Sequence, residues 1–506
     1  MEEKSYKSLK SGSDIRGIAV QTEENEVTLT IEAIYDITKA FLKWLADKTG
    51  KETLRVAVGN DVRISSNAIY AAVQKSIVES GCNLVICGVS TTPSMFILLK
   101  ESDWECDASI MITASHLPYD RNGLKFFTPE GGLSGADIDE IIALAEKGEA
   151  LPRRWGNVEE KSYMDAYCRK LVGVVRTGTG KSAPLFGKRI IVDAGNGVGG
   201  FFVKKVLQQL GAITDGSINL TPDGNFPAHA PNPEDPVAIN ALCQAVLASH
   251  AELGVIFDTD VDRAAIVDGN GKLINRDNLI ALTAATLLED KPATIVTDSV
   301  TSDGLTDFIA SLGGKHIRYK RGYKNVISEA QRRNERGEYC PLAMETSGHA
   351  AFAENHFMDD GAYLICKLLV AYARQSQKHE KLSDLIANLV SPVEENEIRV
   401  KFNEQSVNFR HEGDRIIKEL KYFVESDSRI LLAPDNYEGV RINFPAGFGG
   451  GWTLLRQSVH DPVLPINFAS GEEGGNKVMA KQLYYMLDKY PFLDITNLKK
   501  FINGEK

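Results

Sequence analysis

Along most of the chain, a short run of β-branched and other apolar residues is followed by a turn that contains glycine and then by a segment with helical spacing. The predicted strands cover 54–60, 83–89, 107–115, 189–197, 252–260 and 293–300. Helices are predicted near 67–79, 198–210 and 303–312. Strands that alternate with helices predict mostly parallel sheets with helices on both faces.

The pattern changes in the last part of the chain. A helical segment at 408–424 is followed by four short apolar runs, RILLAP, VRINF, WTLLRQS and VLPINF, and then by a last helix at 473–488. Several short strands after one helix predict an α+β domain with an antiparallel sheet. The predicted fold class is therefore α/β: three similar α/β domains with mixed, mostly parallel sheets, and a C-terminal α+β domain.

The length of the chain sets the number of domains. A chain of 506 residues is too long for a single hydrophobic core. Polar or glycine-rich stretches at 176–188, 289–293 and 390–397 indicate boundaries. We therefore predict four domains, which cover 1–182, 183–291, 292–391 and 392–506.

Composition and charge narrow the class of protein. Apolar residues make up 43% of the chain and charged residues 25%, as in ordinary globular proteins. A net charge of -11 without a long basic run gives no reason to expect a nucleic-acid partner. The seven cysteines form no CxxC pair, which favours a reducing, cytoplasmic setting. The longest apolar stretch, 361–373, contains Lys367 and is too short to cross a bilayer, so no membrane is expected.

The first candidate site is TASHLP at 113–118. Ser115 directly follows a predicted strand, which is where α/β domains display their chemistry. A serine on such a loop, next to His116 and ahead of Lys125, can accept a phosphoryl group. Taken alone, a Ser-His pair is more often a simple turn. A Ser-His-Asp hydrolase is less favoured still, because the base of such a nucleophile normally comes from elsewhere in the fold.

The second candidate site is DTDVDR at 258–263. Asp258, Asp260 and Asp262 follow an apolar run, and three carboxylates so close together suit Mg²⁺, which prefers oxygen ligands. An EF-hand is excluded, since Arg263 stands where that loop needs glycine and Gly269 where it needs glutamate. Two other interpretations remain: a solvated acidic turn, and a phosphatase whose nucleophile is Asp258.

Two further motifs suit a phosphorylated, polyhydroxylated ligand. ETSGH at 345–349 offers Glu345, Ser347 and His349 as acceptors and donors for hydroxyl groups. RQSVHDP at 456–462 offers Arg456, Ser458 and His460, which alternate and therefore lie on one side of an extended segment. An arginine, a hydroxyl and an imidazole on one side can bind phosphate. Alone, ETSGH would more readily be an ordinary turn that contains Gly348, and RQSVHDP would as readily be an exposed edge strand.

Together the four motifs are far more specific, because they occur in a fixed order with one in each predicted domain. This order resembles the α-D-phosphohexomutase family, which contains phosphoglucomutases and phosphomannomutases. Supporting segments are SGSDIRG at 11–17, VGNDVRISS at 58–66, VDAGNGVGG at 192–200, PDGNFPAHAPNPEDP at 222–236, RGYKN at 321–325 and DDGAY at 359–363. The resemblance covers nearly the whole chain and implies four domains around a central cleft.

The resemblance also implies roles for the candidate residues. Ser115 would carry a phosphate, which with Asp258, Asp260 and Asp262 would hold one Mg²⁺ per chain. Arg16, Lys125 and Arg263 would line the phosphoryl-transfer centre. The proton of the attacking hydroxyl has three candidate acceptors, namely Lys125, His116 and His349. Lys324, Glu345, Ser347 and His349 would contact the sugar and its phosphate. Arg456, Ser458 and His460 would hold the phosphate that does not react.

The implied activity is the interconversion of hexose 1-phosphate and hexose 6-phosphate, from glucose or mannose or both. It would proceed through phosphoserine and a hexose 1,6-bisphosphate, which is also the activator, in a monomer or homodimer. The family's phosphate loop typically reads Arg-Pro-Ser-Gly-Thr-Glu-Pro, so Gln457, Val459, His460 and Asp461 depart from it. Two alternatives stay open: a magnesium-dependent phosphatase with an aspartyl nucleophile, and a sugar-phosphate binding protein without catalysis.

Overall fold

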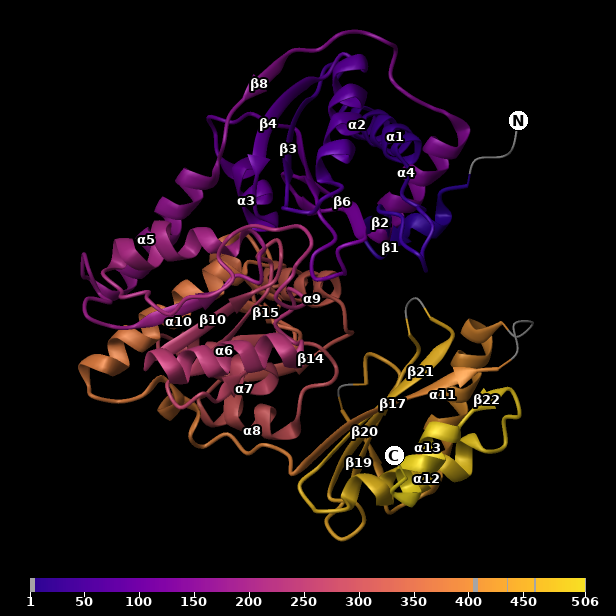
Figure 1. Ribbon diagram of the computed structural model, residues 1–506. Helices are drawn as coiled ribbons and strands as arrows, with labels where there is room; N and C mark the ends of the chain where they lie inside the picture. The colour runs from indigo at the N-terminus through magenta and orange to yellow at the C-terminus, as the bar shows by residue number, and fades with distance from the viewer. Residues whose placement is uncertain (1–4, 404–407, 435, 459–460, 506) are drawn as a thin grey trace. The chain divides into compact units, whose positions relative to one another are not determined.

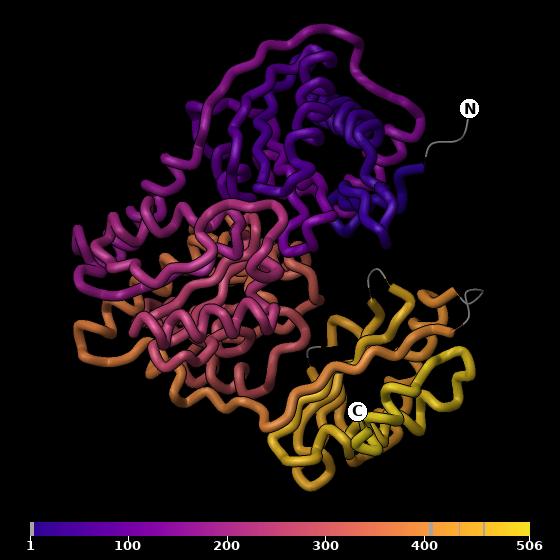
Figure 2. The backbone as a smooth tube through the Cα atoms, viewed as in Figure 1, coloured from indigo at the N-terminus to yellow at the C-terminus, as the bar shows by residue number. Residues whose placement is uncertain are grey.

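The computed structural model describes residues 5–403, 408–434, 436–458 and 461–505. The chain divides into two compact units. Figures 1 and 2 show the course of the backbone, coloured from the N-terminus to the C-terminus. Unit 1 comprises Met1–Asn275 and Ser347–Leu385, and unit 2 comprises Arg276–Thr346 and Ile386–Lys506. The predicted domain boundaries stay predictions.

The first sheet of unit 1 has eight strands in the order β1-β2-β6-β5-β3-β4-β8, with β7 paired to β6. Its strands are β1 (Lys10–Ser11), β2 (Asp14–Ile18), β3 (Arg55–Asn60), β4 (Asn83–Val89), β5 (Ala108–Ile112), β6 (Arg121–Thr128), β7 (Gly131–Gly132) and β8 (Val158–Glu160). Its helices are α1 (Ile31–Thr49), α2 (Ser66–Glu79), α3 (Thr92–Ile97), α4 (Gly135–Lys147) and α5 (Met164–Thr179). The sheet is mixed, because β5, β3, β4 and β8 run parallel whereas β1, β2, β6 and β7 pair antiparallel.

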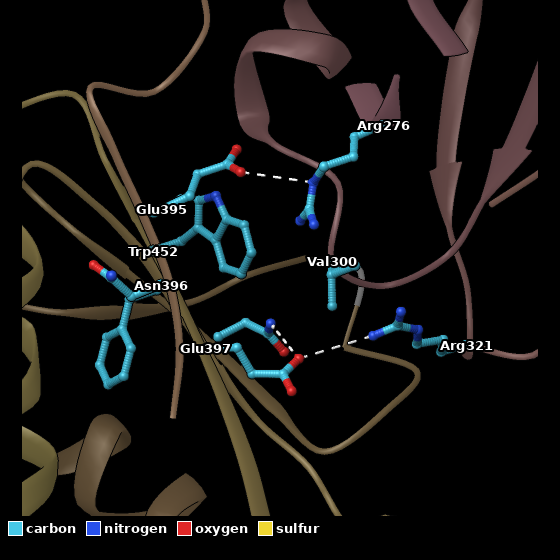
Figure 3. A pocket seen from close by; sticks show the side chains of 10 residues that line it. Arg276, Val300, Arg321, Glu395, Asn396, Glu397 and Trp452 are labelled. Carbon is cyan, nitrogen blue, oxygen red and sulfur yellow. Dashed lines mark hydrogen bonds and ion pairs between the residues drawn. The ribbon is translucent and has the colours of Figure 1, made fainter. Parts of the chain in front are cut away.

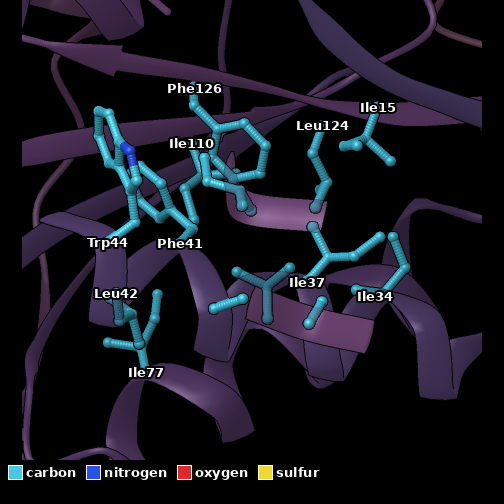
Figure 4. Close-up of a cluster of buried hydrophobic side chains, with 14 of the residues drawn as sticks. Ile15, Ile34, Ile37, Phe41, Leu42, Trp44, Ile77, Ile110, Leu124 and Phe126 are labelled. Carbon is cyan, nitrogen blue, oxygen red and sulfur yellow. The ribbon is translucent and has the colours of Figure 1, made fainter. Parts of the chain in front are cut away.

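The core of this domain lies between the sheet and helices α1, α2 and α4 (Figure 4). The rings of Phe41 in α1 and Phe126 in β6 are 4.5 Å apart, and Ile110 of β5 belongs to the same cluster. Burying each such side chain contributes about 1.5–3 kcal/mol. This packing fixes β5 and β6, which hold the two ends of the loop that carries Ser115.

The second sheet of unit 1 has the order β12-β11-β10-β9. Its strands are β9 (Ile190–Asp193), β10 (Leu253–Phe257), β11 (Ala264–Asp268) and β12 (Leu273–Ile274), and α6 (Pro236–Ser249) packs on them. Strand β10 runs parallel to β9 and antiparallel to β11, so β10 and β11 form a hairpin. The hairpin loop holds residues 258–263. Unit 1 also contains β16 (Ala350–Phe352) and α10 (Gly361–Gln377), which packs against α5.

The helix predicted near 198–210 is present, but most of its turns are not of the α type. The segment consists of 3₁₀ turns at Val198–Gly200 and Gln208–Leu210 on either side of a π turn at Val203–Leu207. Two adjacent glycines, Gly199 and Gly200, lie in its first turn, and glycine is a poor helix former. They allow close packing: a Cβ on Gly199 would lie 3.0 Å from the Phe257 ring, and one on Gly200 would lie 2.5 Å from the carbonyl oxygen of Leu220.

Unit 2 begins with a third α/β domain. Its elements are α7 (Arg276–Leu288), β13 (Thr294–Thr297), α8 (Asp303–Ser311), β14 (Lys315–Arg318), α9 (Tyr323–Glu335) and β15 (Leu342–Met344). Strands β14 and β15 both run parallel to β13. The loops after the three strands therefore leave the same edge of the sheet, where α/β proteins usually bind ligands.

Unit 2 ends with an antiparallel sheet in the order β18-β19-β20-β21-β17-β22. The strands are β17 (Glu394–Phe402), β18 (Leu431–Leu432), β19 (Val440–Phe444), β20 (Gly451–Leu455), β21 (Val463–Ser470) and β22 (Leu493–Asp494). Helices α11 (Phe409–Ser426), α12 (Gly475–Leu487) and α13 (Thr496–Asn503) share one core with it (Figure 1). The predicted fold class is thus confirmed. The helix predicted at 473–488 is not the last one: α13 follows it, and the pattern missed α13 because Leu498 is its one buried residue.

Among the described residues, no helix combines the length and the apolar character that a bilayer crossing needs.

Candidate active site

Ser115 lies in the loop between β5 and β6, in a backbone conformation with φ of +51°. Residues other than glycine rarely adopt this left-handed region, so the surrounding contacts must hold it. The backbone N–H of Ser115 donates to Thr113 Oγ1 at 2.9 Å, and Thr113 Oγ1 donates to Asp61 Oδ2 at 2.7 Å. The strained turn is therefore tied to the loop that follows β3.

Arg63, which the sequence analysis did not single out, holds the same loop from within. Its side chain is completely buried and pairs with Asp61 at 3.1 Å. The guanidinium donates to the carbonyl oxygens of Ser115 (2.5 Å), Pro118 (2.6 Å), Leu117 (2.7 Å) and Arg121 (2.9 Å). Arg63 lies within VGNDVRISS, one of the segments that carry the family resemblance, but no local pattern shows that it bonds a loop some fifty residues later.

Arg63→Lys is expected to lower the free energy of unfolding by about 2 kcal/mol, because an ammonium group keeps the charge but cannot reach four separated carbonyls. Urea-induced unfolding measures this change. Arg55→Lys is the matched control, since Arg55 is part-exposed and its 2.6 Å pair with Glu159 lies at the surface. Equal unfolding midpoints for Arg63→Lys and the control would contradict the role of Arg63.

The three aspartates lie together in the hairpin loop between β10 and β11. Asp258, Asp260 and Asp262 are buried, and one oxygen from each lies within 4.8 Å of the others. Val261 has φ of +66°, an unusual conformation for a β-branched residue, which the surrounding contacts must hold. Ser115 Oγ donates to Asp258 Oδ2 at 2.9 Å. The predicted nucleophile and the predicted metal ligands therefore share one site within unit 1.

The carboxylate cluster fits a divalent cation. Asp260 Oδ1 and Asp262 Oδ1 are buried and have no hydrogen-bond partner among the described residues. The pKa of Asp258 is raised well above its usual range by burial and by the charges of Asp262 and Asp260. Carboxylate oxygens without hydrogen-bond partners, held where like charges repel, are suited to binding Mg²⁺.

Two cations pair with the aspartates, and a neutral imidazole lies beside Ser115. Lys125 Nζ pairs with Asp260 at 3.0 Å and with Asp262 at 2.5 Å. Burial lowers the pKa of Lys125, but these two carboxylates outweigh burial and raise it above its usual value, so the side chain stays charged. His116 Nδ1 lies 3.3 Å from Ser115 Oγ and accepts from Arg263 Nη2 at 2.7 Å. Burial and then Arg263 lower the pKa of His116 to about 3, so its ring is neutral and carries its proton on Nε2.

Arg16, Ser347 and His349 are the other predicted residues of unit 1. Arg16 lies in β2 and pairs with Asp14 at 2.8 Å, and its charge helps to lower the pKa of His116. His349 forms a backbone bridge to Arg263, and burial lowers its pKa well below the usual range. Ser347 is half-buried at the start of the same segment. Gly348 between them has φ of +91°, and a Cβ there would lie 2.8 Å from the Ala264 carbonyl oxygen, so only glycine fits.

The predicted sugar-binding residues of unit 2 lie at the carboxyl edge of β13, β14 and β15. Glu345 follows β15, and its Oε1 accepts from the backbone N–H of Gly322 at 2.6 Å. Lys324 is in the first turn of α9, two residues after Gly322. Thr346 Oγ1 donates to Asp298 Oδ2 at 2.8 Å, which fixes the segment that follows Glu345. The structure thus brings Glu345 and Lys324 to one edge.

A cavity of about 180 Å³ lies within unit 2 (Figure 3). Arg321 reaches it from the loop before α9, with its Nη1 4.0 Å from Glu397 Oε2. Arg276 lies 3.7 Å from Glu395, and Trp452 forms part of the wall. The charged side chains that line the cavity are therefore paired with one another, and among the described residues none of those predicted to bind substrate lines it.

The predicted phosphate-binding residues follow β20. The N–H groups of Arg456 and Ser458 donate to the carbonyls of Pro465 and Val463, at 3.2 and 3.1 Å, so the strand ladder continues beyond Leu455. Arg456 is buried, which lowers the pKa of its guanidinium, and its Nε has no hydrogen-bond partner among the described residues. An unused buried donor is suited to binding an anion. His460 lies outside the described residues.

Comparisons with known proteins agree with this arrangement. Three family models, described as phosphoglucomutase/phosphomannomutase α/β/α domains I, II and III, match residues 7–151, 165–271 and 275–393 in that order. The chain is 31% identical to a phosphoglucomutase from Neisseria gonorrhoeae over 485 residues, 95% of this chain and 96% of that protein. It is 29% identical to a phosphomannomutase/phosphoglucomutase from Pseudomonas aeruginosa over 467 residues, 91% of each chain.

The fold is also known from solved structures. A phosphoglucomutase/phosphomannomutase family protein from Burkholderia thailandensis superposes with a TM-score of 0.79, at 24% identity, over 96% of this chain and 98% of that one. The match covers all four predicted domains. The resemblance inferred from the motifs is confirmed, and the chain belongs to the α-D-phosphohexomutase family, whose members are phosphotransferase isomerases.

Proposed function

We propose that this protein is a phosphohexomutase that interconverts hexose 1-phosphate and hexose 6-phosphate, with glucose or mannose phosphates or both as substrates. The observation that carries the proposal is the 2.9 Å hydrogen bond from Ser115 Oγ to Asp258, which puts a serine hydroxyl against a cluster of carboxylates suited to a cation. The names of the relatives, phosphoglucomutase and phosphomannomutase, support the same reaction class.

In the proposed reaction Ser115 carries a phosphoryl group. A free hydroxyl of the hexose monophosphate attacks its phosphorus, the bond to Ser115 Oγ breaks, and the hexose 1,6-bisphosphate forms. The proton released by the hydroxyl restores the neutral serine. The bisphosphate turns around and returns its other phosphoryl group to Ser115. Free bisphosphate acts as the activator, because it restores phosphoserine whenever that group is lost.

Charge stabilisation supplies most of the rate in phosphoryl transfer. One Mg²⁺ held by Asp258, Asp260, Asp262 and the phosphoserine would supply positive charge beside the moving phosphoryl group. Arg263 and Lys125 add fixed cations, and Arg16 adds a third. The neutral His116 offers its Nε2–H as a donor, so its role in the proposal is to orient the phosphoryl group.

The remaining proposed contacts concern the substrate. Glu345, Ser347, Lys324 and His349 contact the sugar hydroxyls and the sugar phosphate. Arg456, Ser458 and His460 bind the phosphate that does not react, with the unused Nε of Arg456 as the main support. Because the bisphosphate reacts in both orientations, these groups must bind the sugar in each of them.

Coupled assays with glucose 1-phosphate and mannose 1-phosphate, in the presence of Mg²⁺ and catalytic glucose 1,6-bisphosphate, test the proposal. We expect the hexose 6-phosphate as product, and the mass of one phosphoryl group on the peptide that contains Ser115. Net release of inorganic phosphate with label on Asp258 would instead support an aspartyl phosphatase. Binding of both sugar phosphates in a calorimeter without turnover would support a silent binding protein.

A further inference from the structure

Gln457 connects the phosphate-binding segment to helix α11. Its side-chain Nε2 donates to the backbone carbonyl of Arg410 at 3.0 Å and to Asp414 Oδ1 at 2.7 Å. Both acceptors lie in the first two turns of α11, and all three residues are in unit 2. One side-chain amide therefore uses both of its N–H groups on one helix.

The surface of α11 is shaped to receive this side chain. Gly413 lies between the two acceptors in sequence, and a Cβ on it would be 2.6 Å from Gln457 Cδ and 2.8 Å from Gln457 Nε2. Any larger residue at 413 would therefore push the amide away from the helix. The absence of a side chain at this position lets Gln457 lie directly against the backbone of α11.

Gln457 occupies the position between Arg456 and Ser458. On an extended segment, neighbouring side chains point to opposite sides, so Gln457 points away from the side shared by Arg456 and Ser458. It reaches α11 from behind the phosphate-binding groups. Fixing the extended segment 456–458 in one conformation costs conformational entropy. The hydrogen bonds of Gln457 to α11 offset this cost in the free protein, so that less of it has to be met when the ligand binds.

We propose that Gln457 is a positioning residue, which holds Arg456 and Ser458 in place for a substrate phosphate by fixing their segment to α11. The inference rests on the proposed phosphate-binding role of Arg456 and Ser458. Gln457 stands where the family's usual loop has proline, so the inference gives this departure a function. Gly413 and Asp414 contribute to the same function, because they provide the space and one acceptor for the Gln457 amide.

Gln457→Glu is the sharpest test, because glutamate has the shape of glutamine but no N–H donors, and it faces the carboxylate of Asp414. We expect KM for glucose 1-phosphate to rise about 5- to 20-fold, as for the loss of a charge-assisted hydrogen bond, while kcat changes less than about 2-fold. The thermal unfolding midpoint should stay within about 2 °C of the wild type, since the contact is at the surface. An unchanged KM in an active enzyme would overturn the inference.

A second substitution, at Asp414, tests whether a new contact to α11 restores the KM that Gln457→Glu raises. Combining Gln457→Glu with Asp414→Lys puts an ammonium group opposite the new carboxylate, and KM should return to within about 3-fold of the wild type. Asp414→Asn alone is the matched control, since its amide oxygen still accepts from Gln457 and KM should hardly change. A folded double variant whose KM stays as high as that of Gln457→Glu would overturn the inference.

Calorimetric titration with glucose 6-phosphate separates this inference from the proposed function. It measures phosphate binding without turnover, and the affinity of Gln457→Glu should fall by the same factor as 1/KM. If the wild-type protein binds glucose 6-phosphate but does not isomerise it, the mutase proposal fails while the role of Gln457 is still decided by the two affinities. Equal affinities of Gln457→Glu and the wild type overturn the role of Gln457, whatever the turnover.

Discussion

Ser115→Ala is expected to lower the turnover of hexose phosphates by at least about 10³-fold, because the variant has no oxygen to carry the phosphoryl group. The Asp258, Asp260 and Asp262 side chains are unchanged, so the variant should still bind Mg²⁺. Coupled assays measure the loss of turnover, and intact mass should show no phosphoryl group on the variant after incubation with glucose 1,6-bisphosphate.

The matched control is Ser109→Ala, which removes a buried hydroxyl from β5, the strand that leads into the Ser115 loop. Ser109 Oγ donates to the Met95 carbonyl at 2.6 Å, so its loss should cost about 1 kcal/mol of stability and leave turnover close to that of the wild type. The comparison separates the chemistry of one hydroxyl from general damage to the strand. Normal turnover of Ser115→Ala would end the proposal that phosphate passes through this serine.

The sequence predicted the parts of the site that depend on local pattern. Ser115 and the aspartate at 258 each follow an apolar strand, and the ends of such strands are where α/β domains place their chemistry. The alternation of Arg456 and Ser458 likewise follows from the period of an extended chain, and the structure shows the ladder that the pattern requires. These placements could be predicted because they need only neighbours in sequence, and the roles of the residues stay predictions.

Contacts between distant segments could not be predicted in this way. Arg63 bonds a loop some fifty residues later, and Gln457 bonds a helix that begins almost fifty residues earlier. An arginine or glutamine has the same local pattern whether it is solvated or buried against distant carbonyls, so its partners depend on the tertiary fold. The segment 198–210 shows the same limit for the fold: its helical spacing was visible, but its tight packing on Phe257 was not.

Asp258→Asn is expected to lower turnover by at least about 10²-fold and yet to make the metal-free protein more stable, by about 1–3 kcal/mol at pH 7. The two effects have one cause, since burial and then the charges of Asp262 and Asp260 raise the pKa of Asp258 well above the usual value. A carboxyl group whose pKa is higher in the folded protein stabilises the fold while protonated, and this stabilisation is lost as pH rises through the folded pKa. Asparagine keeps the shape of the side chain and carries no charge at any pH, so the stability of the variant does not fall in this way as pH rises.

Thermal unfolding in a chelator and in excess Mg²⁺ tests both effects. With the chelator, the wild type should lose stability relative to Asp258→Asn as pH is raised. With Mg²⁺, the wild type should gain stability according to the affinity of the site, and Asp258→Asn should gain less because one ligand is weaker.

Asp268→Asn, at the other end of β11, is the control: asparagine can still accept from the N–H groups of Asn270 and Lys272, and Mg²⁺ should stabilise it like the wild type. If Mg²⁺ stabilises the wild type and Asp258→Asn equally, the three aspartates do not hold the cation together, and the carboxylates must be balanced by Lys125 and Arg263 alone.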